Sequence, residues 1–129
     1  MSIDEMAVSV DRDLLELAGS ELLRISVSWM EDTAIMVLAG EVDLSTGSML
    51  QEHLQDIVPG ARGGLVVDLG LVTFLGSTGM SILVTTHKQL QAQGSRLVVF
   101  APTPWIRRLF ELCHMNSVLV IVPDDSDEN

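Results

Sequence analysis

The spacing of apolar residues predicts a hairpin at the start of the patterned region. Residues 23–29 alternate between apolar and polar side chains, which is the period-two pattern of a half-buried strand. Residues 34–40, AIMVLAG, form a continuous apolar run, which is typical of a strand covered on both faces. The polar pair Glu31-Asp32 separates the two runs, so we expect an antiparallel pair joined by a short turn.

Three later segments carry apolar residues at helical spacing. The first follows Ser45 or Asp43, either of which can cap it, and ends at Pro59-Gly60. The second follows residues 76–79, and the third follows Thr103, a capping residue placed before a proline. The expected buried stripes are Leu50, Leu54, Ile57 and Val58; then Met80, Leu83, Val84, His87 and Leu90; then Ile106, Leu109, Phe110 and Cys113.

Short apolar runs between these stripes predict three more strands, at residues 64–70, 96–101 and 117–122. The order is therefore β-β-α-β-α-β-α-β. Strands that alternate with helices imply right-handed crossovers, so the expected fold is a single α/β domain with a mostly parallel sheet and an antiparallel edge hairpin.

The two ends of the chain lack this pattern. We interpret residues 1–20 as an acidic N-terminal extension, in which DRDLLELAG has the composition of a short helix, and residues 123–129 as an acidic tail. The domain itself is expected to span residues 21–122.

Composition narrows the classes of function. The chain has 129 residues and a net charge of -11 with only 7 Lys and Arg, which argues against binding to nucleic acid. The apolar runs are too short to cross a bilayer, and no basic and apolar leader begins the chain, so neither a membrane protein nor a secreted one is expected. Cys113 is alone, which fits a reducing compartment and predicts a cytoplasmic protein.

Polar residues follow two neighbouring strands and share a predicted edge of the sheet. Asp43, Ser45 and Thr46 come after the second strand, and residues 76–79, Gly-Ser-Thr-Gly, come after the third. Each group begins a helix, where free N–H groups and the helix dipole favour negative charge. The simpler interpretation is that these hydroxyls are helix caps and nothing more.

Several familiar chemistries do not fit these loops. A phosphate-binding P-loop needs a lysine that neither loop has, and a hydrolase elbow needs glycine where Leu75 stands. None of His53, His87 and His114 is placed beside Ser77 by a motif that would make it a general base. The chain also lacks the acidic pair of a phospho-aspartate receiver and the ligand spacing of a zinc site, so no catalysis, metal or cofactor is expected.

One hypothesis remains, in which Ser77 is modified by another protein. The flanking glycines allow a partner's active site to approach closely. A phosphate on Ser77 adds roughly -1.5 to -2 charges. A helix start tolerates that charge, whereas an interface packed around a neutral hydroxyl does not. Phosphorylation would therefore leave the fold unchanged and alter binding.

At this point three segments resemble a known family. GEVDLST, VVDLGLVTFLGSTG and PWIRRLFEL look like the STAS domain of anti-sigma factor antagonists, and the resemblance covers residues 21–122. It implies a bacterial regulator of transcription and stress response that binds an anti-sigma factor, itself a serine kinase of the GHKL type, and so frees a sigma factor. Phosphorylation by the kinase abolishes binding, and a serine phosphatase restores it.

The resemblance also assigns roles to positions. The phosphoacceptor falls on Ser77, and Asp43 falls at the partner-facing edge. The residues expected to take part in partner binding are Asp43, Ser45, Thr46, Gly76, Ser77, Thr78 and Gly79.

The chain departs from the family pattern at Gly76, where the family usually has aspartate. The loss of that acid leaves open weaker phosphorylation, a different kinase, or a module that binds without being switched. The rival hypotheses are a STAS module of a stressosome-type or transporter-associated assembly, an enzyme with Ser77 as its nucleophile, and nucleotide binding at the loop edge.

Overall fold

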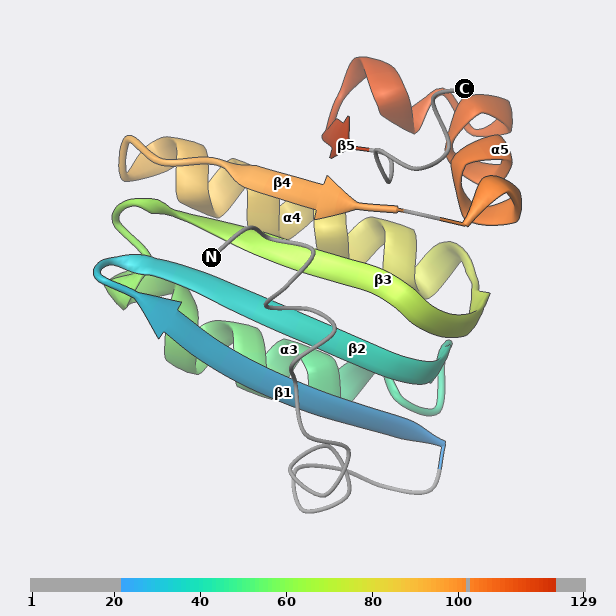
Figure 1. Cartoon of the computed structure of the whole chain (residues 1–129), viewed down its shortest axis with the longest axis horizontal. Coiled ribbons are helices and arrows are strands. Elements are labelled where there is room, and N and C mark those ends of the chain that lie inside the picture. Colours follow the sequence, from blue (N-terminus) through green and yellow to red (C-terminus); the bar gives the residue numbers. More distant parts are fainter. Residues whose placement is uncertain (1–21, 102, 123–129) are drawn as a thin grey trace.

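The computed structural model describes residues 22–101 and 103–122, which form a five-stranded sheet in the order β1-β2-β3-β4-β5 (Figure 1). β1 pairs with β2 in antiparallel fashion, and the other pairs are parallel. The strands are β1 Leu23–Met30, β2 Thr33–Val42, β3 Gly64–Leu75, β4 Leu97–Phe100 and β5 Val120–Val122. The helices are α3 Gly47–Ile57, α4 Ser77–Ala92 and α5 Pro104–Leu112, with short 3₁₀ turns η1 Val58–Gly60 and η2 Met115–Ser117. The predicted fold class is confirmed.

The hairpin between β1 and β2 forms as the pattern predicts. Met30 pairs with Thr33, so Glu31 and Asp32 make a two-residue turn. Glu31 has a φ of 55°, the left-handed conformation that such turns require. The predictions for residues 1–20 and 123–129, including the short helix, lie outside the described residues.

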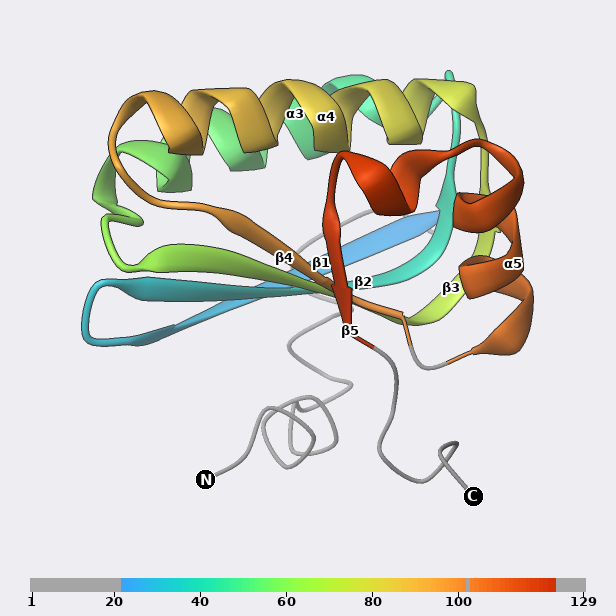
Figure 2. The same cartoon turned by 90° about the horizontal axis from the view of Figure 1, so that it is seen from above.

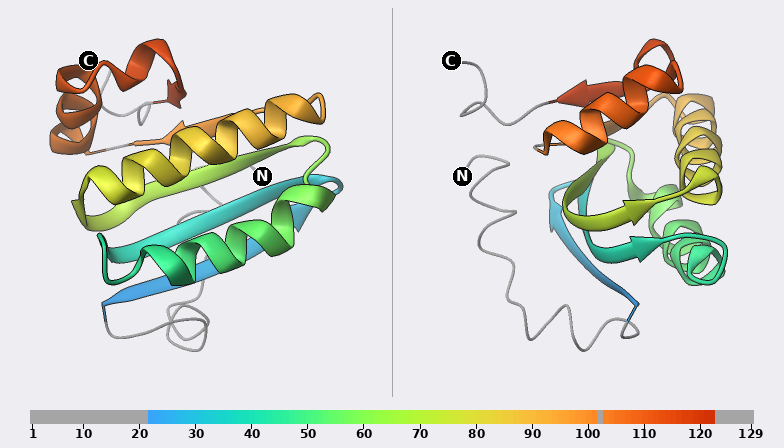
Figure 3. Two further views of the ribbon diagram at one scale, coloured as in Figure 1. Left: turned by 180° about the vertical axis from the view of Figure 1, so that it is seen from behind. Right: turned by 90° about the vertical axis from the view of Figure 1, so that its right-hand side faces the viewer.

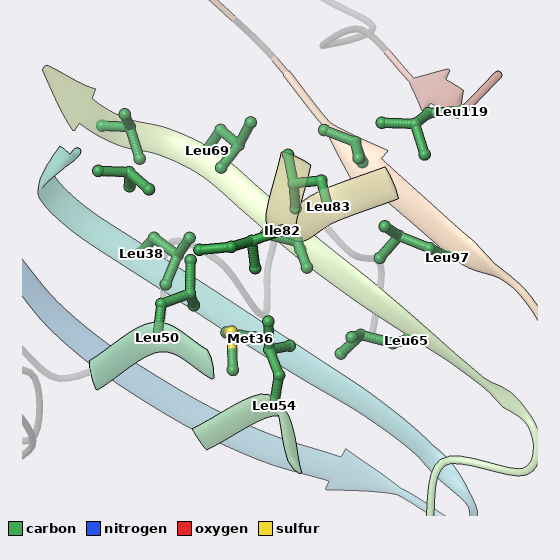
Figure 4. Packing of buried hydrophobic residues seen from close by; sticks show 14 of the residues in the cluster. Met36, Leu38, Leu50, Leu54, Leu65, Leu69, Ile82, Leu83, Leu97 and Leu119 are labelled. Atoms are coloured by element: carbon green, nitrogen blue, oxygen red, sulfur yellow. The ribbon is translucent and has the colours of Figure 1, made fainter. Parts of the chain in front are cut away.

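The core lies between the sheet and the helices. α3 and α4 cover the same face of the sheet, α3 near β1 and β2 and α4 near β3 and β4 (Figures 2 and 3). Leu50 and Leu54 of α3 lie beside Leu38 and Met36 of β2, and Leu83 of α4 lies between Leu69 and Leu97 (Figure 4). The predicted stripes of these two helices are confirmed: Leu50, Leu54, Ile57, Val58, Met80, Leu83, His87 and Leu90 are buried, and Val84 is half-buried.

The strand bounds differ from their predictions, most clearly at the end of β3 and at the start of β5. β3 runs to Leu75, five residues beyond the predicted end, because β2 continues to Val42 and two register shifts keep the strands paired. β5 starts at Val120, not at residue 117, because the amide groups of residues 118 and 119 both donate to the Met115 carbonyl and hold that segment in a turn.

The prediction that Cys113 is buried is wrong. α5 ends at Leu112, and the Cys113 side chain is exposed. Ile106 and Phe110 are fully buried, as predicted, and Leu109 is half-buried. The helical spacing stops applying where the helix ends, so the residue three positions after Phe110 no longer faces the core.

The predicted start of α5 at Thr103-Pro104 is confirmed in position, whereas the predicted cap of α3 is wrong, and neither N-cap side chain makes a cap hydrogen bond. Thr46 occupies the N-cap position of α3, where the sequence suggested Ser45 or Asp43, and its side chain makes no cap hydrogen bond. Thr103 is at the N-cap of α5, but its hydroxyl oxygen is buried without a hydrogen-bond partner in the described part of the chain. The Leu50 amide donates to the Thr46 carbonyl oxygen and the Arg107 amide to the Thr103 carbonyl oxygen, which are the first hydrogen bonds within each helix. In the first turn of α3, the Gly47 amide donates to the Asp43 carbonyl oxygen.

Candidate functional site

The two predicted loops lie side by side at the edge where β2 and β3 end (Figure 1). The Gly76 amide donates to the Val42 carbonyl oxygen over 3.0 Å. A Cβ atom on Gly47 would lie 2.9 Å from Cγ2 of Thr78. The starts of α3 and α4 therefore pack closely against each other, and the missing side chain of Gly47 makes room for this contact. A Cβ on Gly79 would lie 2.6 Å from Val42 Cγ1, which is too close for any side chain. The prediction that both groups share one edge is confirmed.

Asp43 organises the β2–α3 loop. Its Oδ1 accepts hydrogen bonds from the Ser45 hydroxyl at 2.7 Å, the Ser45 amide at 2.9 Å and the Thr46 amide at 3.2 Å. The Thr46 hydroxyl donates to the Glu41 carbonyl oxygen at 2.9 Å and accepts from the Asp43 amide at 3.0 Å. Thr46 is buried, so its hydroxyl holds the loop and does not reach the surface, whereas Ser45 is exposed.

Hydrogen bonding keeps the Asp43 carboxyl ionised. The Ser45 hydroxyl is the largest cause, and together with the Ser45 and Thr46 amides it lowers the pKa of Asp43 below the ordinary value of 3.8. A carboxyl whose pKa is lowered by folding stabilises the fold above its ordinary pKa, and this contribution is lost as the pH falls through the lowered value.

An Asp43→Asn variant is therefore expected to be slightly less stable than the wild type at pH 7, with the difference disappearing as the pH falls below 3.8. Thermal unfolding of both proteins between pH 7 and pH 2 measures it. Asparagine keeps the shape and one acceptor oxygen, so a difference that persists unchanged at low pH would contradict the role of the charge.

Ser77 is the first residue of α4, and its side chain is exposed. The N-cap position belongs to Gly76, and α4 has no side-chain cap hydrogen bond. Within the described residues the Ser77 hydroxyl makes no hydrogen bond, so the interpretation of Ser77 as a helix cap is wrong. Thr78 is half-buried and Gly79 is buried, which leaves Ser77 as the accessible hydroxyl of this loop.

The backbone does not require glycine at position 76. Gly76 has a φ of -94°, which any residue adopts. A Cβ atom there would lie 3.2 Å from Cε2 of Phe74, so a side chain fits after a small movement of the ring. An aspartate at this N-cap would accept hydrogen bonds from the first turn of α4. The missing family acid is therefore not a consequence of the fold.

Sequence reasoning missed exposed apolar residues at this edge. Leu44, next to Asp43, is 83% exposed, and Phe74, two residues before Gly76, is 48% exposed. Trp105, in the first turn of α5 after β4, is 44% exposed. These three residues are called the edge patch below. Leu44, an apolar residue inside the polar segment GEVDLST, was the signal in the sequence that could have indicated this surface. Exposed aromatic and aliphatic anchors are typical of protein interfaces.

The described residues offer no base beside Ser77. Nδ1 of His53 lies 2.9 Å from the Met49 carbonyl oxygen, and His114 is exposed beyond α5. His87 is buried and lies ten residues after Ser77 on α4, about 15 Å along the helix. Asp68, buried in β3, accepts a hydrogen bond from the Gly70 amide at 2.8 Å, which supports the strand.

Neither a metal site nor a membrane span is found in the described part of the chain. No group of three or more His, Cys, Asp or Glu residues there could hold a metal ion. No helix in residues 22–101 and 103–122 is both long and apolar enough to cross a membrane.

Comparison with known proteins identifies the family. A family model described as "Mlab, STAS domain" matches residues 25–123, and the chain belongs to the STAS domain family. The anti-sigma-F factor antagonist RsfB of Mycobacterium tuberculosis is 31% identical over 74 residues, and the match spans 57% of this chain and 61% of RsfB. The anti-sigma-B factor antagonist of Listeria monocytogenes is 31% identical over 94 residues, covering 71% of this chain and 81% of that protein.

A solved structure agrees with this family. The crystal structure of an anti-sigma factor antagonist from Mycobacterium paratuberculosis superposes with a TM-score of 0.73 at 26% identity, covering 85% of this chain and 93% of that one. The resemblance of residues 21–122 to the STAS family, and the fold that it implied, are thereby confirmed.

Proposed function

We propose that this protein is an anti-sigma factor antagonist that binds an anti-sigma factor when Ser77 is unmodified and loses that binding when Ser77 is phosphorylated. The observation that carries the proposal is the Ser77 hydroxyl, exposed and without a hydrogen bond in the described structure, at the first position of α4. Its two relatives named above are antagonists of anti-sigma-F and anti-sigma-B factors.

The surroundings of Ser77 favour a switch by charge. A phosphate on the first residue of α4 lies close to free amide groups and the positive end of the helix dipole, so the fold tolerates it. The edge patch offers an apolar surface to a partner. A doubly charged group buried against such a surface has to lose its hydration without a paired charge, which weakens binding.

The resemblance to the family, and not the geometry, suggests the partners. The anti-sigma factor is proposed to be a GHKL-type serine kinase that phosphorylates Ser77, and a serine phosphatase reverses the modification. Asp43 and Ser45 present polar groups beside the edge patch, while Thr46 and Gly79, both buried, hold the two loops in place. The protein itself acts by binding and not by catalysis, because no described base lies beside Ser77.

Incubation with its anti-sigma factor and Mg-ATP is expected to add one phosphate per chain at Ser77. Intact-mass and peptide mass spectrometry measure the number and position of phosphates. Ser77→Ala should gain none, and Thr78→Val, a matched change at the half-buried neighbour, should still gain one. A phosphate on Thr78 or at another position would contradict the assignment.

Gly76 supports one alternative function. Without the family acid, the module could bind its partner with no phospho-switch. The phosphorylation assay separates this alternative from the phospho-switch. If the alternative holds, Gly76→Asp should accept phosphate while the natural chain does not. If both chains are phosphorylated at Ser77, the alternative fails.

A further inference from the structure

β1 forms one edge of the sheet, and half of its backbone groups face away from β2 (Figure 1). The Glu41 amide donates to the Leu22 carbonyl oxygen at 2.8 Å, so these two residues are a hydrogen-bonded pair. Such pairs alternate with non-bonded pairs in an antiparallel ladder. Every second residue from Leu22 to Met30 therefore bonds to β2, which agrees with the two-residue turn that Met30 and Thr33 close. The residues that direct their N–H and C=O groups outward are Leu23, Ile25, Val27 and Trp29.

The outward backbone groups are free from Ile25 onward. Leu23 has a further interaction partner, so the free part of the edge does not include it. No residue in 22–101 or 103–122 forms a hydrogen bond to the outward N–H and C=O groups of Ile25, Val27 and Trp29. A row of unpaired backbone groups on an edge strand is a template for the addition of another strand.

This part of β1 lacks the features that usually protect an edge strand. Residues 25–30, ISVSWM, contain no charged residue, no proline and no glycine. Trp29 and Met30 are each 45% exposed. The other edge strand, β5, has only three residues and is followed by Pro123, which limits pairing there. β1 is therefore the edge at which another strand can be added.

We propose that β1 pairs with β1 of a second copy of this chain, antiparallel and centred on Val27. In this register Val27 lies opposite Val27 of the other copy, and Ile25 lies opposite Trp29 of the other copy. Each free N–H and C=O group then gains a partner. The neighbouring registers are worse, because they place Trp29 opposite Leu23, or Ile25 opposite Glu31 in the turn.

The side chains also match in this register. Ile25 and Val27 face the helix side of the sheet, where they pack in the main core. Trp29 of the other copy lies opposite Ile25 there, and pairs of an aromatic and a β-branched residue stabilise sheets. On the opposite side of the sheet Ser26 lies opposite Ser28 of the other copy, so two small hydroxyl groups meet. This self-complementarity favours a second copy over a strand of another protein.

The net charge opposes this pairing at long range. Each copy carries a net charge of -11, whereas residues 25–30 carry none. Arg24 is the only charged residue of β1, and in this register it lies opposite Met30 of the other copy. Salt screens charges that are more than about 8 Å apart at physiological ionic strength. We therefore expect the affinity of the dimer to rise with salt.

Hydrogen exchange of the full, unsubstituted chain tests the pairing. Sedimentation velocity identifies dilute conditions in which the chain is a monomer and concentrated conditions in which it is a dimer. The amides of Ile25, Val27 and Trp29 should exchange quickly in the monomer and roughly tenfold or more slowly in the dimer. The amides of Ser26 and Ser28, which face β2, should exchange slowly in both.

Two results of this experiment would overturn the proposal. One is a chain that stays monomeric at every concentration. The other is a dimer in which the amides of Ile25, Val27 and Trp29 still exchange as quickly as in the monomer, because the contact between copies then lies elsewhere.

Two double variants test the register. Ser26→Lys with Ser28→Lys places lysines opposite each other and should weaken the dimer by roughly tenfold or more. Ser26→Lys with Ser28→Glu places opposite charges face to face and should restore the affinity. General repulsion between acidic chains predicts the reverse order, because the double-lysine variant has the smaller net negative charge. Thermal unfolding checks that both variants are folded, and equal dimer affinities would contradict the register.

Discussion

Ser77→Asp is expected to weaken binding to the anti-sigma factor by roughly 30-fold or more, which corresponds to about 2 kcal/mol. The physical reason is the edge patch, since Leu44 and Phe74 give the partner an apolar surface against which a new carboxylate is desolvated. Stability should not fall, because an acid in the first turn of a helix is favourable. Isothermal titration with the purified anti-sigma factor measures the change in affinity.

Two matched variants separate charge from size. Ser77→Ala removes the hydroxyl and should bind within a few-fold of the wild type, because the Ser77 hydroxyl has no hydrogen bond to lose in the described structure. Ser77→Asn has the shape of aspartate without its charge, so it should retain much more affinity than Ser77→Asp. Equal losses for the asparagine and aspartate variants would show that size, and not charge, controls binding.

Phe110→Ala is expected to lower the free energy of unfolding by about 3–5 kcal/mol, because it leaves a cavity under α5. Phe110 is fully buried in the main core, and with Ile106 it holds α5 against the sheet. α5 carries Trp105 of the edge patch, so the variant should also weaken partner binding. Urea unfolding followed by circular dichroism measures the stability.

The control lies on the same helix. Leu112 is 63% exposed, so Leu112→Ala should change the free energy of unfolding by less than about 0.5 kcal/mol. If the two alanine variants proved equally stable, α5 would not be packed as described.

The fold could be predicted from the sequence because burial leaves a strong periodic pattern. Both faces of β2 are buried, and this produces the unbroken apolar run from Ala34 to Leu38. The predictions that were wrong concern the ends of elements, where the periodic pattern no longer reports which side chains are buried. The end of α5 turns Cys113 outward, and the extension of β3 to Leu75 depends on register shifts with β2 that local sequence does not encode.

The site was predicted in part. Topology alone indicated that Asp43 and Ser77 share an edge, because both follow parallel strands. The roles of side chains within the loops could not be predicted in the same way. The sequence suggested caps at Asp43 or Ser45 and at Ser77, whereas Asp43 binds the turn before its helix and Ser77 caps nothing. Such hydrogen bonds depend on loop conformation, which only the folded chain defines.

The division of the buried strand residues between the two faces of the sheet was not predictable for a similar reason. Ile35 and Val66 belong to continuous apolar runs, and the pattern shows only that both faces of these strands are covered. It does not show which segment covers each face. In the structure the helix residues of the core pack against one side, and Ile35, Val66 and Phe100 form a separate cluster of strand residues.

The central claim is that phosphate on Ser77 controls partner binding, and one titration tests it most directly. The anti-sigma factor is titrated with the unmodified chain, with the chain carrying one phosphate at Ser77, and with that sample after phosphatase treatment. We predict that the phosphate lowers the affinity by roughly 30-fold or more and that its removal restores the original value. Equal affinity of the unmodified and phosphorylated chains would contradict the proposed switch.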